Sequence, residues 1–310
     1  MVDVSIIIPF KDQLAQLKRC IKGILNQNIE LTFEIVILDS SSSTVQRDIE
    51  KLSDKINYFR ISPDSFNHGF TRNEGVNFAN GKVLVFTVQD SMAVDSFWLS
   101  SLVQPLIDNK LDGICGKQIS NPNEDTNPIW WYRPIDKPTI KIIDIKSIEF
   151  NNLKSQEKME YIGWDNVNSA YLKESLLKVP FRKMMFGEDA QWAVDAINTN
   201  FRIAYTSFSV VYHDHPFDFK FAVKRTLAEY YTRKKTVDLN PVKPKLKLIT
   251  ILKWIYLLFR STKNPLKIIY WFTISYKQHI AEKRAFTKWD KMGFSKVENF
   301  LINNVPMSQK

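Results

Sequence analysis

VSIIIPF at residues 4–10 and FEIVILD at residues 33–39 are the stretches that decide the fold. Both are short apolar runs rich in β-branched residues, which is typical of buried strands. Between them, residues 14–27 place apolar side chains such as Leu17 and Ile21 on one face at helical spacing. A strand, an amphipathic helix and a second strand predict the first β-α-β unit of a parallel sheet.

The same alternation continues over the following residues. Apolar strands are predicted at 56–61 and 82–88, and helices at 44–54, 71–79 and 96–109. This pattern predicts an α/β fold with a Rossmann-like, mostly parallel sheet and flanking helices. Ligands of such sheets bind beyond the carboxyl ends of the strands.

The region after residue 110 is less regular. Residues 119–160 are rich in Pro, Asn and Lys, which predicts loops and edge strands, and they include the aromatic pair Trp130 and Trp131. Residues 188–198 predict a helix, and residues 202–213 predict two strand-like pieces.

Charge is unevenly distributed along the chain, whose net charge is +10. Residues 216–310 carry 20 Lys and Arg against 6 Asp and Glu, whereas residues 1–215 carry 23 against 27. The basic part also mixes aromatic residues with lysine and almost lacks glycine. We therefore predict two domains, with a helical extension at 216–310.

The extension has two apolar runs, at 248–259 and 265–276. Each is shorter than the roughly twenty residues that a membrane span needs. Aromatic side chains beside lysine favour an interfacial helix on an anionic membrane surface, so no nucleic-acid partner is expected. The alternative is that these helices pack on the first domain or on a second copy.

The start of the chain and its cysteines indicate the compartment. Residues 1–10 have neither a basic region nor a long apolar one, so we predict no signal peptide. Cys20 and Cys115 lie in apolar surroundings outside any metal-binding spacing, which predicts buried thiols in a reducing compartment. The sequence therefore favours a cytoplasmic protein.

Polar motifs follow the apolar strands. Asp39 ends the second predicted strand and Asp90 follows the fourth, so we expect both carboxylates in one crevice. Sequence fingerprints of a P-loop, a dinucleotide fold, a zinc protease and a nucleophile elbow are absent. The motifs in chain order are Pro9-Phe10, Asp39 with Ser40 to Ser43, His68 to Gly75, Gln89-Asp90-Ser91, Gly187-Glu188-Asp189 and Val211 to His215.

In this order and spacing, the six motifs resemble family 2 of the glycosyltransferases, the inverting enzymes of the GT-A fold. The resemblance covers residues 3–215, and within the family the chain looks most like bacterial rhamnosyltransferases of surface-polysaccharide assembly. It implies a GT-A catalytic domain at 1–215. It also implies transfer of one sugar, for which a deoxyhexose such as rhamnose is the best expectation, from a nucleoside diphosphate donor to a saccharide. A lipid-linked acceptor would place the protein peripherally on the inner face of the cytoplasmic membrane.

The resemblance implies a donor site at the strand ends. In the family, the aspartate at Asp39 holds the nucleotide base, and a carboxylate can accept hydrogen bonds from a base or a ribose. The Arg72-Asn73 pair orders the donor pocket, since a guanidinium matches two diphosphate oxygens. A plain turn at Asp39 and a surface salt bridge at Arg72 are the alternatives. The expected donor-binding residues are Pro9, Phe10, Asp39, Ser41, Arg72, Asn73, Gln89 and Asp90.

Asp90 carries the metal prediction. The family usually has Asp-x-Asp here, which binds Mg²⁺ or Mn²⁺ on the donor diphosphate through hard carboxylate oxygens. Asp90 matches the second aspartate, and Val88 replaces the first. By resemblance His213 completes the metal shell, and a structural histidine is the alternative.

Glu188 and Asp189 are the expected catalytic pair. Inverting transfer needs a carboxylate that takes the proton of the acceptor hydroxyl. By resemblance Asp189 is this base, and Glu188 orients it or binds the acceptor. The alternative is a pair of acids favoured by a helix N-terminus. Trp164, Asp165 and Asn168 offer the aromatic face and the hydrogen bonds that a sugar acceptor needs, with core packing as the alternative for the tryptophan.

Two rival functions stay open from the sequence. A sugar nucleotidyltransferase would release pyrophosphate, but the Gly-rich N-terminal loop that it usually needs is missing. The second rival is a non-catalytic scaffold that binds a nucleotide or a membrane. The one feature in its favour is Val88, which replaces the first aspartate of the family motif.

Overall fold

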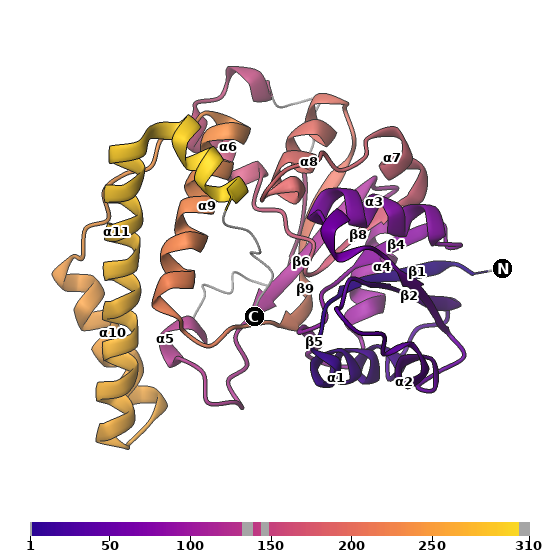
Figure 1. Ribbon diagram of the computed structural model, residues 1–310, viewed down its shortest axis with the longest axis horizontal. Coiled ribbons are helices and arrows are strands. Elements are labelled where there is room, and N and C mark those ends of the chain that lie inside the picture. Colours follow the sequence, from indigo (N-terminus) through magenta and orange to yellow (C-terminus); the bar gives the residue numbers. More distant parts are fainter. Residues whose placement is uncertain (1, 132–138, 144–148, 304–310) are drawn as a thin grey trace. The chain divides into compact units, whose positions relative to one another are not determined.

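The computed structural model describes residues 2–131, 139–143 and 149–303, and the chain divides into two compact units (Figure 1). The first unit comprises Met1–Ile119 and Ile135–His213. The second comprises Ser120–Pro134 and Asp214–Lys310, so it includes a segment in which the sequence predicted loops and edge strands. Each unit is described by itself.

One mixed sheet of nine strands lies at the centre of the first unit, counted over the described residues. The strands span Val4–Phe10 (β1), Phe33–Asp39 (β2), Ile56–Arg60 (β3), Val83–Phe86 (β4), Met92–Ala93 (β5), Gly113–Ile119 (β6), Ile140–Ile143 (β7), Ser169–Leu172 (β8) and Ile203–Tyr212 (β9). Their order is β3-β2-β1-β4-β8-β6-β9-β5, with β7 paired to β9. The first four strands and the β6–β9 pair are parallel, and β8 is antiparallel to both of its neighbours.

Helices flank this sheet. They span Leu14–Leu25 (α1), Gln46–Glu50 (α2), His68–Phe78 (α3), Trp98–Asp108 (α4), Ser155–Lys158 (α6), Lys173–Lys178 (α7) and Glu188–Asn198 (α8). The predicted α/β fold with flanking helices is confirmed, and the sheet is mixed, with β1 to β4 forming its parallel part. The prediction of two strand-like pieces at 202–213 is wrong, because β9 is continuous. The helix predicted from residue 71 begins at His68, since the Asn67 side chain accepts a hydrogen bond from Phe70 N and caps it.

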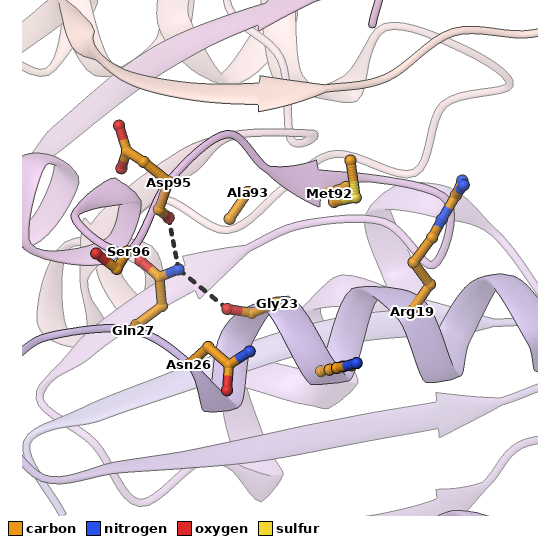
Figure 2. A pocket seen from close by; sticks show the side chains of 9 residues that line it. Arg19, Gly23, Asn26, Gln27, Met92, Ala93, Asp95 and Ser96 are labelled. Carbon is orange, nitrogen blue, oxygen red and sulfur yellow. Dashed lines mark hydrogen bonds between the residues drawn. The ribbon is translucent and has the colours of Figure 1, made fainter. Parts of the chain in front are cut away.

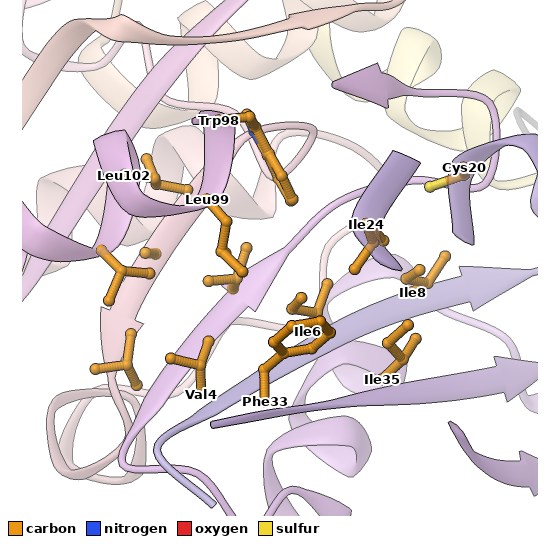
Figure 3. Packing of buried hydrophobic residues seen from close by; sticks show 14 of the residues in the cluster. Val4, Ile6, Ile8, Cys20, Ile24, Phe33, Ile35, Trp98, Leu99 and Leu102 are labelled. Carbon is orange, nitrogen blue, oxygen red and sulfur yellow. The ribbon is translucent and has the colours of Figure 1, made fainter. Parts of the chain in front are cut away.

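One face of the sheet packs against α1 and α4 (Figure 3). Alternate residues of β1, among them Ile6 and Ile8, belong to this core together with Ile24 of α1 and Leu99 of α4. Cys20 lies in the same cluster. The prediction of buried thiols is confirmed, since both cysteines are buried and free.

The other face of the sheet packs against α3 and α8. A Cβ at Gly75 of α3 would come within 2.6 Å of Ile7 and 2.9 Å of Leu38. This close approach favours glycine and lets α3 lie directly over β1 and β2. Further along the face, Trp192 of α8 packs edge-on against Tyr171 of β8, with ring centroids 4.6 Å apart.

The second unit is helical. Its helices span Pro128–Trp131 (α5), Phe219–Val237 (α9), Leu248–Ser261 (α10) and Pro265–Asn303 (α11), which agrees with the helical C-terminal part expected from the sequence. α11 packs along α9 and α10 and is kinked at Gly293, whose φ is 70°. The side chain of Trp131 lies outside the described residues. Over the described residues, none of the helices combines the length and the apolar character needed to cross a bilayer.

Candidate active site

The register of the parallel strands sets the place of the candidate site. Phe10, the last residue of β1, pairs with Asp39, the last residue of β2. Ile7 pairs with Phe86, the last residue of β4, so the loops after these three strands leave the same edge of the sheet. The Phe10 side chain is 1% exposed and belongs to the core, and Pro9 is partly buried beside it in β1. The Phe10 side chain is therefore part of the hydrophobic core.

Asp39 is fully buried and accepts three hydrogen bonds within the protein. Its Oδ1 accepts from Ser41 N at 2.7 Å. Its Oδ2 accepts from Arg60 Nη1 at 2.9 Å and from the Tyr58 hydroxyl. Burial and the hydrogen bond to Asp39 raise the pKa of Tyr58. Since a carboxylate has about four acceptor sites, most of the acceptor capacity of Asp39 is used within the protein.

Arg60 connects this buried carboxylate to the surface. Its side chain is 37% exposed, and it also donates to the carbonyl oxygens of Ser41 and Ser43. Asp39 therefore holds a guanidinium beside the loop that follows β2. The sequence reasoning missed this arginine, although Arg60 pairs with Asp39 in the register of β2 and β3.

Ser41 and Gln89 fix the loop between β1 and α1. Ser41 Oγ accepts a hydrogen bond from Asp12 N at 2.7 Å, at a residue whose φ is 57°. Gln89 Oε1 accepts from Lys11 N at 2.7 Å, and its Nε2 donates to Lys11 O at 3.2 Å. Two of the predicted donor-binding residues thus hold the loops after β1, β2 and β4 together.

Arg72 joins α3 to the start of α8. It is 5% exposed, and its Nη1 donates to the buried carboxylate of Glu188. Its buried Nε atom has no hydrogen-bond partner within the described part of the chain. Next to it, Asn73 donates to Phe181 O at 2.9 Å and accepts from Phe181 N at 3.1 Å. The Arg72 and Asn73 side chains therefore each connect two segments that are distant in the chain.

Glu188 and Asp189 open α8 after Gly187, which adopts the left-handed conformation with φ at 80°. Glu188 is buried, whereas Asp189 is half-buried. Asp189 accepts hydrogen bonds from Ala190 N at 2.8 Å and from Asn166 N at 3.3 Å. Burial and repulsion from Glu188 raise the pKa of Asp189 to about 6.

Asp165 is a second acid with a raised pKa in the same place. Its Oδ1 accepts from Val167 N at 3.0 Å, and its Oδ2 accepts from Gln118 Nε2 at 3.0 Å. Burial and repulsion from Asp189 raise the pKa of Asp165 to about 6. Because repulsion is mutual, ionisation of one of these two carboxyls disfavours ionisation of the other.

Trp164 and Asn168 lie in the interior. Trp164 is 4% exposed and donates to the Tyr171 hydroxyl at 2.6 Å. Asn168 is fully buried and accepts from Trp98 Nε1 at 2.9 Å. Both side chains thus have structural partners. Their assignment to acceptor binding stays a prediction, and Asp165 is the half-buried residue of the three.

Asp90 and His213 come together although they are distant in the chain. His213 Nε2 lies 3.6 Å from Asp90 Oδ1. His213 Nδ1 is 2.7 Å from Gln118 Oε1, and the amide nitrogen of this glutamine donates to the Asp165 carboxylate. Because the Oε1 atom can only accept, the Nδ1–H of His213 donates to it, and Nε2 is the ring nitrogen that lies nearest Asp90.

This arrangement can hold a divalent cation. Asp90 and His213, both in the first unit, each offer one ligand atom, and these two atoms lie 3.6 Å apart. A donor set of one carboxylate and one imidazole suits Mn²⁺ better than Mg²⁺, because imidazole is the softer ligand. Val88 adds no side-chain ligand. The sequence reasoning missed Gln118, which lies in β6 without a motif around it.

A separate pocket of about 440 Å³ lies between α1 and the segment that runs from β5 to α4 (Figure 2). Gln27 spans it at one end by donating to Gly23 O at 3.0 Å and to Asp95 O at 2.9 Å. Arg19 and Met92 line the other end. None of the site residues predicted from the sequence lines this pocket.

The sheet order and the acids beyond its strand ends define a GT-A-type α/β protein. Residues 5–169 match the family described as Glycosyl transferase family 2. This match covers more than half of the chain, and the chain belongs to this family.

Two curated relatives are similar in sequence. The chain is 26% identical over 194 residues to the O-antigen chain rhamnosyltransferase RfbN of Salmonella typhimurium, an alignment that covers 59% of this chain and 57% of the relative. It is 29% identical over 187 residues to the O-antigen chain rhamnosyltransferase WbaN of Salmonella anatum, covering 59% and 56%. The chain thus spans a little over half the length of these relatives.

Solved structures share the fold. TarS of S. aureus superposes with a TM-score of 0.55 at 14% identity, covering 93% of this chain and 55% of TarS. The mannosyltransferase PcManGT of Pyrobaculum calidifontis, in complex with GDP-Man and Mn²⁺, superposes with a TM-score of 0.53 at 13% identity, covering 97% and 78%. At these identities the likeness concerns the fold alone.

Removal of the Arg72 guanidinium should destabilise the first unit. In Arg72→Met the buried Glu188 carboxylate loses its partner, and breaking such a pair costs about 3–5 kcal/mol. Urea unfolding of the full chain, followed by tryptophan fluorescence, measures this loss. Arg72→Met combined with Glu188→Leu should recover much of it, because no unpaired charge is then buried.

The matched control is Arg225→Met in the second unit. Arg225 pairs with Glu229 on the surface of α9 at 3.5 Å, and both side chains are at least 40% exposed. Its removal should cost less than about 1 kcal/mol. Equal losses for Arg72→Met and Arg225→Met would contradict the assignment of a buried structural pair.

Proposed function

We propose that this chain is an inverting glycosyltransferase of surface-polysaccharide assembly. It transfers one sugar, a deoxyhexose such as rhamnose, from a nucleoside diphosphate donor to a saccharide acceptor that is lipid-linked. Membership of glycosyl transferase family 2 and the names of the two rhamnosyltransferase relatives support this proposal. A solved structure of TarS 1-349 with UDP-GlcNAc has the same fold at 14% identity and a TM-score of 0.53.

The observation that carries the proposal is the position of Asp189. It is half-buried at the start of α8, beside the buried Glu188, so this residue is partly accessible from the surface. Its environment supports the role of a base, because a pKa of about 6 makes this carboxylate a stronger base than an ordinary aspartate. A scaffold that only binds a nucleotide would not need such a group.

The reaction moves one proton and exchanges two bonds. Asp189 takes the proton of the acceptor hydroxyl as that oxygen forms a bond to the anomeric carbon of the donor sugar. The bond from this carbon to the diphosphate oxygen breaks on the opposite side, and the nucleoside diphosphate leaves with the electron pair. Arg72 holds Glu188 next to Asp189 and thereby positions the base.

Asp90 and His213 would hold the metal ion. Mg²⁺ or Mn²⁺ there would neutralise charge that develops on the departing diphosphate. The role of these two residues is to present one carboxylate and one imidazole to the cation. Gln118 contributes by keeping the His213 proton on Nδ1.

The second unit supplies a surface for the membrane that holds a lipid-linked acceptor, on the inner face of the cytoplasmic membrane. α10 exposes apolar side chains at helical spacing, from 37% for Ile255 to 71% for Leu248. Basic residues accompany them, including Lys253 and Arg260. Apolar side chains with cations beside them are typical of a helix that lies in the headgroup region of an anionic membrane. The exposed apolar residues of α10 are Leu248, Ile249, Leu252, Ile255, Tyr256 and Phe259.

Asp189→Asn should abolish turnover and leave donor binding intact. General base catalysis typically contributes about 10²–10⁴-fold, so we expect kcat to fall by this factor. Nucleoside diphosphate release from a panel of nucleotide sugars measures turnover, and calorimetry measures donor binding. Unchanged turnover in Asp189→Asn would refute the role of this base.

The pH dependence of kcat tests the same carboxyl independently. Because the base must be ionised and its pKa is about 6, kcat should rise with pH through about 6 and level off above. Asp165→Asn removes a repulsion that disfavours ionised Asp189, so the midpoint should move to lower pH. A midpoint that stays in place in Asp165→Asn would contradict the coupling between the two acids.

Gln118→Leu should weaken Mn²⁺ binding by about 10–100-fold, because loss of the partner that orients a histidine ligand has this effect. Electron paramagnetic resonance of free Mn²⁺ measures the affinity without turnover. Gln104→Leu is the matched control, since Gln104 is an exposed glutamine of α4 whose amide donates to Asp108 at 2.8 Å. Equal Mn²⁺ affinities of both variants would exclude the Gln118–His213 link from the metal site.

Vesicle co-sedimentation tests the membrane surface. Replacement of Ile249, Leu252 and Phe259 by serine should weaken binding to all vesicles. Replacement of Lys253 and Arg260 by glutamine should reduce only the preference for anionic lipid. Each basic residue near the surface contributes about 1 kcal/mol.

The control for this experiment is Phe208→Ser, which changes an exposed aromatic residue of β9 in the first unit. The proposal of a membrane-binding surface fails if the wild-type chain does not bind vesicles of phosphatidylglycerol. A dimer that dissociates when the exposed apolar residues of α10 are made polar would instead assign them to a contact with a second copy.

A further inference from the structure

The second unit contains a cavity of about 440 Å³ that the proposed reaction does not use. α5, the segment before α10, α10 and α11 form its wall, so all of its lining belongs to this one unit. Cavities of a few hundred Å³ and upward are the size in which proteins bind small ligands. The lining residues are Ile129, Trp130, Pro244, Lys245, Leu246, Thr250, Trp254, Ser275, Gln278, His279 and Glu282.

Two tryptophans form the aromatic part of the wall. Trp130 of α5 and Trp254 of α10 are both partly exposed, so part of each indole is available to a ligand. Trp254 packs edge-on against Phe272 with ring centroids 6.2 Å apart. Trp130 packs against the small core of Leu258 and Trp271 in the same unit. These contacts hold both rings in place before a ligand arrives.

The polar part of the wall comes from α11. His279 is 7% exposed, and its Nε2 has no hydrogen-bond partner within the part of the chain that the structure describes. Its Nδ1 lies 3.9 Å from Glu282 Oε2, and Gln278 donates to Glu282 Oε1 at 3.3 Å. Since a buried polar atom without a partner is costly, the Nε2 atom favours a hydrogen-bonding ligand in the cavity that His279 lines.

We propose that this cavity is a saccharide-binding site, distinct from the site at Asp189. A pyranose ring has an apolar face of C–H groups and an edge of hydroxyls. The apolar face fits an indole, and the hydroxyls can both donate and accept toward His279, Gln278 and Glu282. The choice of a saccharide also rests on the proposed function, because a transferase that extends a saccharide meets this ligand as its acceptor.

Other ligand classes fit the wall less well. A phosphate or another anion would meet Lys245 but also the Glu282 carboxylate, which repels it. An acyl chain would fit the tryptophans but leave His279 Nε2 without a partner. A neutral ligand with hydroxyls on one side satisfies both parts of the wall.

Saturation-transfer NMR and calorimetry on the full chain test this site without donor. The probes are methyl glycosides and trisaccharides of rhamnose, mannose and glucose. We expect at least one trisaccharide to bind, and Trp254→Ala to weaken it by about tenfold or more, as truncation of an aromatic anchor does. Thr250→Phe should also weaken binding, because it fills the cavity from a partly exposed position without removing a lining aromatic ring.

Two controls separate this site from misfolding and from the active site. Tyr276→Ala removes an exposed aromatic ring from α11 outside the cavity lining, and it should bind the trisaccharide like the wild type. Asp189→Asn should also bind the trisaccharide normally while its turnover falls. Because the binding assay contains no donor, failure of the proposed activity and failure of this site are distinguishable.

Three outcomes would overturn the proposal. One is no saccharide binding by the wild-type chain, and another is equal binding by the wild type, Trp254→Ala and Thr250→Phe. The third is displacement of the bound trisaccharide by UDP, GDP or dTDP, which would place the saccharide at the strand-end site instead of in this cavity.

Discussion

The parallel register of β1 against β2 and β4 is the constraint on which the candidate site depends. It brings the ends of three strands to one edge of the sheet, where Phe10 pairs with Asp39 in the register. Hydrogen bonds between the loops then complete the arrangement, because Gln89 binds both the N–H and the carbonyl of Lys11, and Ser41 binds the next residue of the same loop. The polar surface beyond the sheet is therefore a consequence of backbone pairing, and a shift of one residue in β1 would disrupt it.

The three acids Glu188, Asp189 and Asp165 differ in how their charge is compensated. Arg72 pairs with Glu188 in the interior, whereas Asp165 and Asp189 are subject to burial together with repulsion, from Asp189 at Asp165 and from Glu188 at Asp189. These effects raise the pKa of both groups toward neutrality, which is the range in which a carboxylate works well as a general base. The buried ion pair therefore matters for the position of Asp189 as much as for stability.

Sequence periodicity predicted the first four strands, the helices among them and the fold class, because buried β-branched runs and amphipathic helices leave local signals. It did not predict that β8 inserts antiparallel between β4 and β6, since no local pattern records the direction of a neighbour. The motifs located Asp39, Asp90 and Asp189, but their surroundings include Arg60 and Gln118, which were missed. These two residues act through contacts across neighbouring strands, and the sequence of a single strand carries no sign of such contacts.

Val88 replaces the first aspartate of the family motif, and this replacement changes which ligands are available to a cation. A cation held by Asp90 and His213 would have one charged ligand, because a neutral imidazole adds a donor without adding charge. Such a site binds a hard cation less tightly than two carboxylates would, so the oxygens of a donor diphosphate would become a larger share of the ligand shell. Metal and donor would then bind together rather than in sequence, and Gln118 matters because it keeps the His213 proton on Nδ1, away from the atom that faces Asp90.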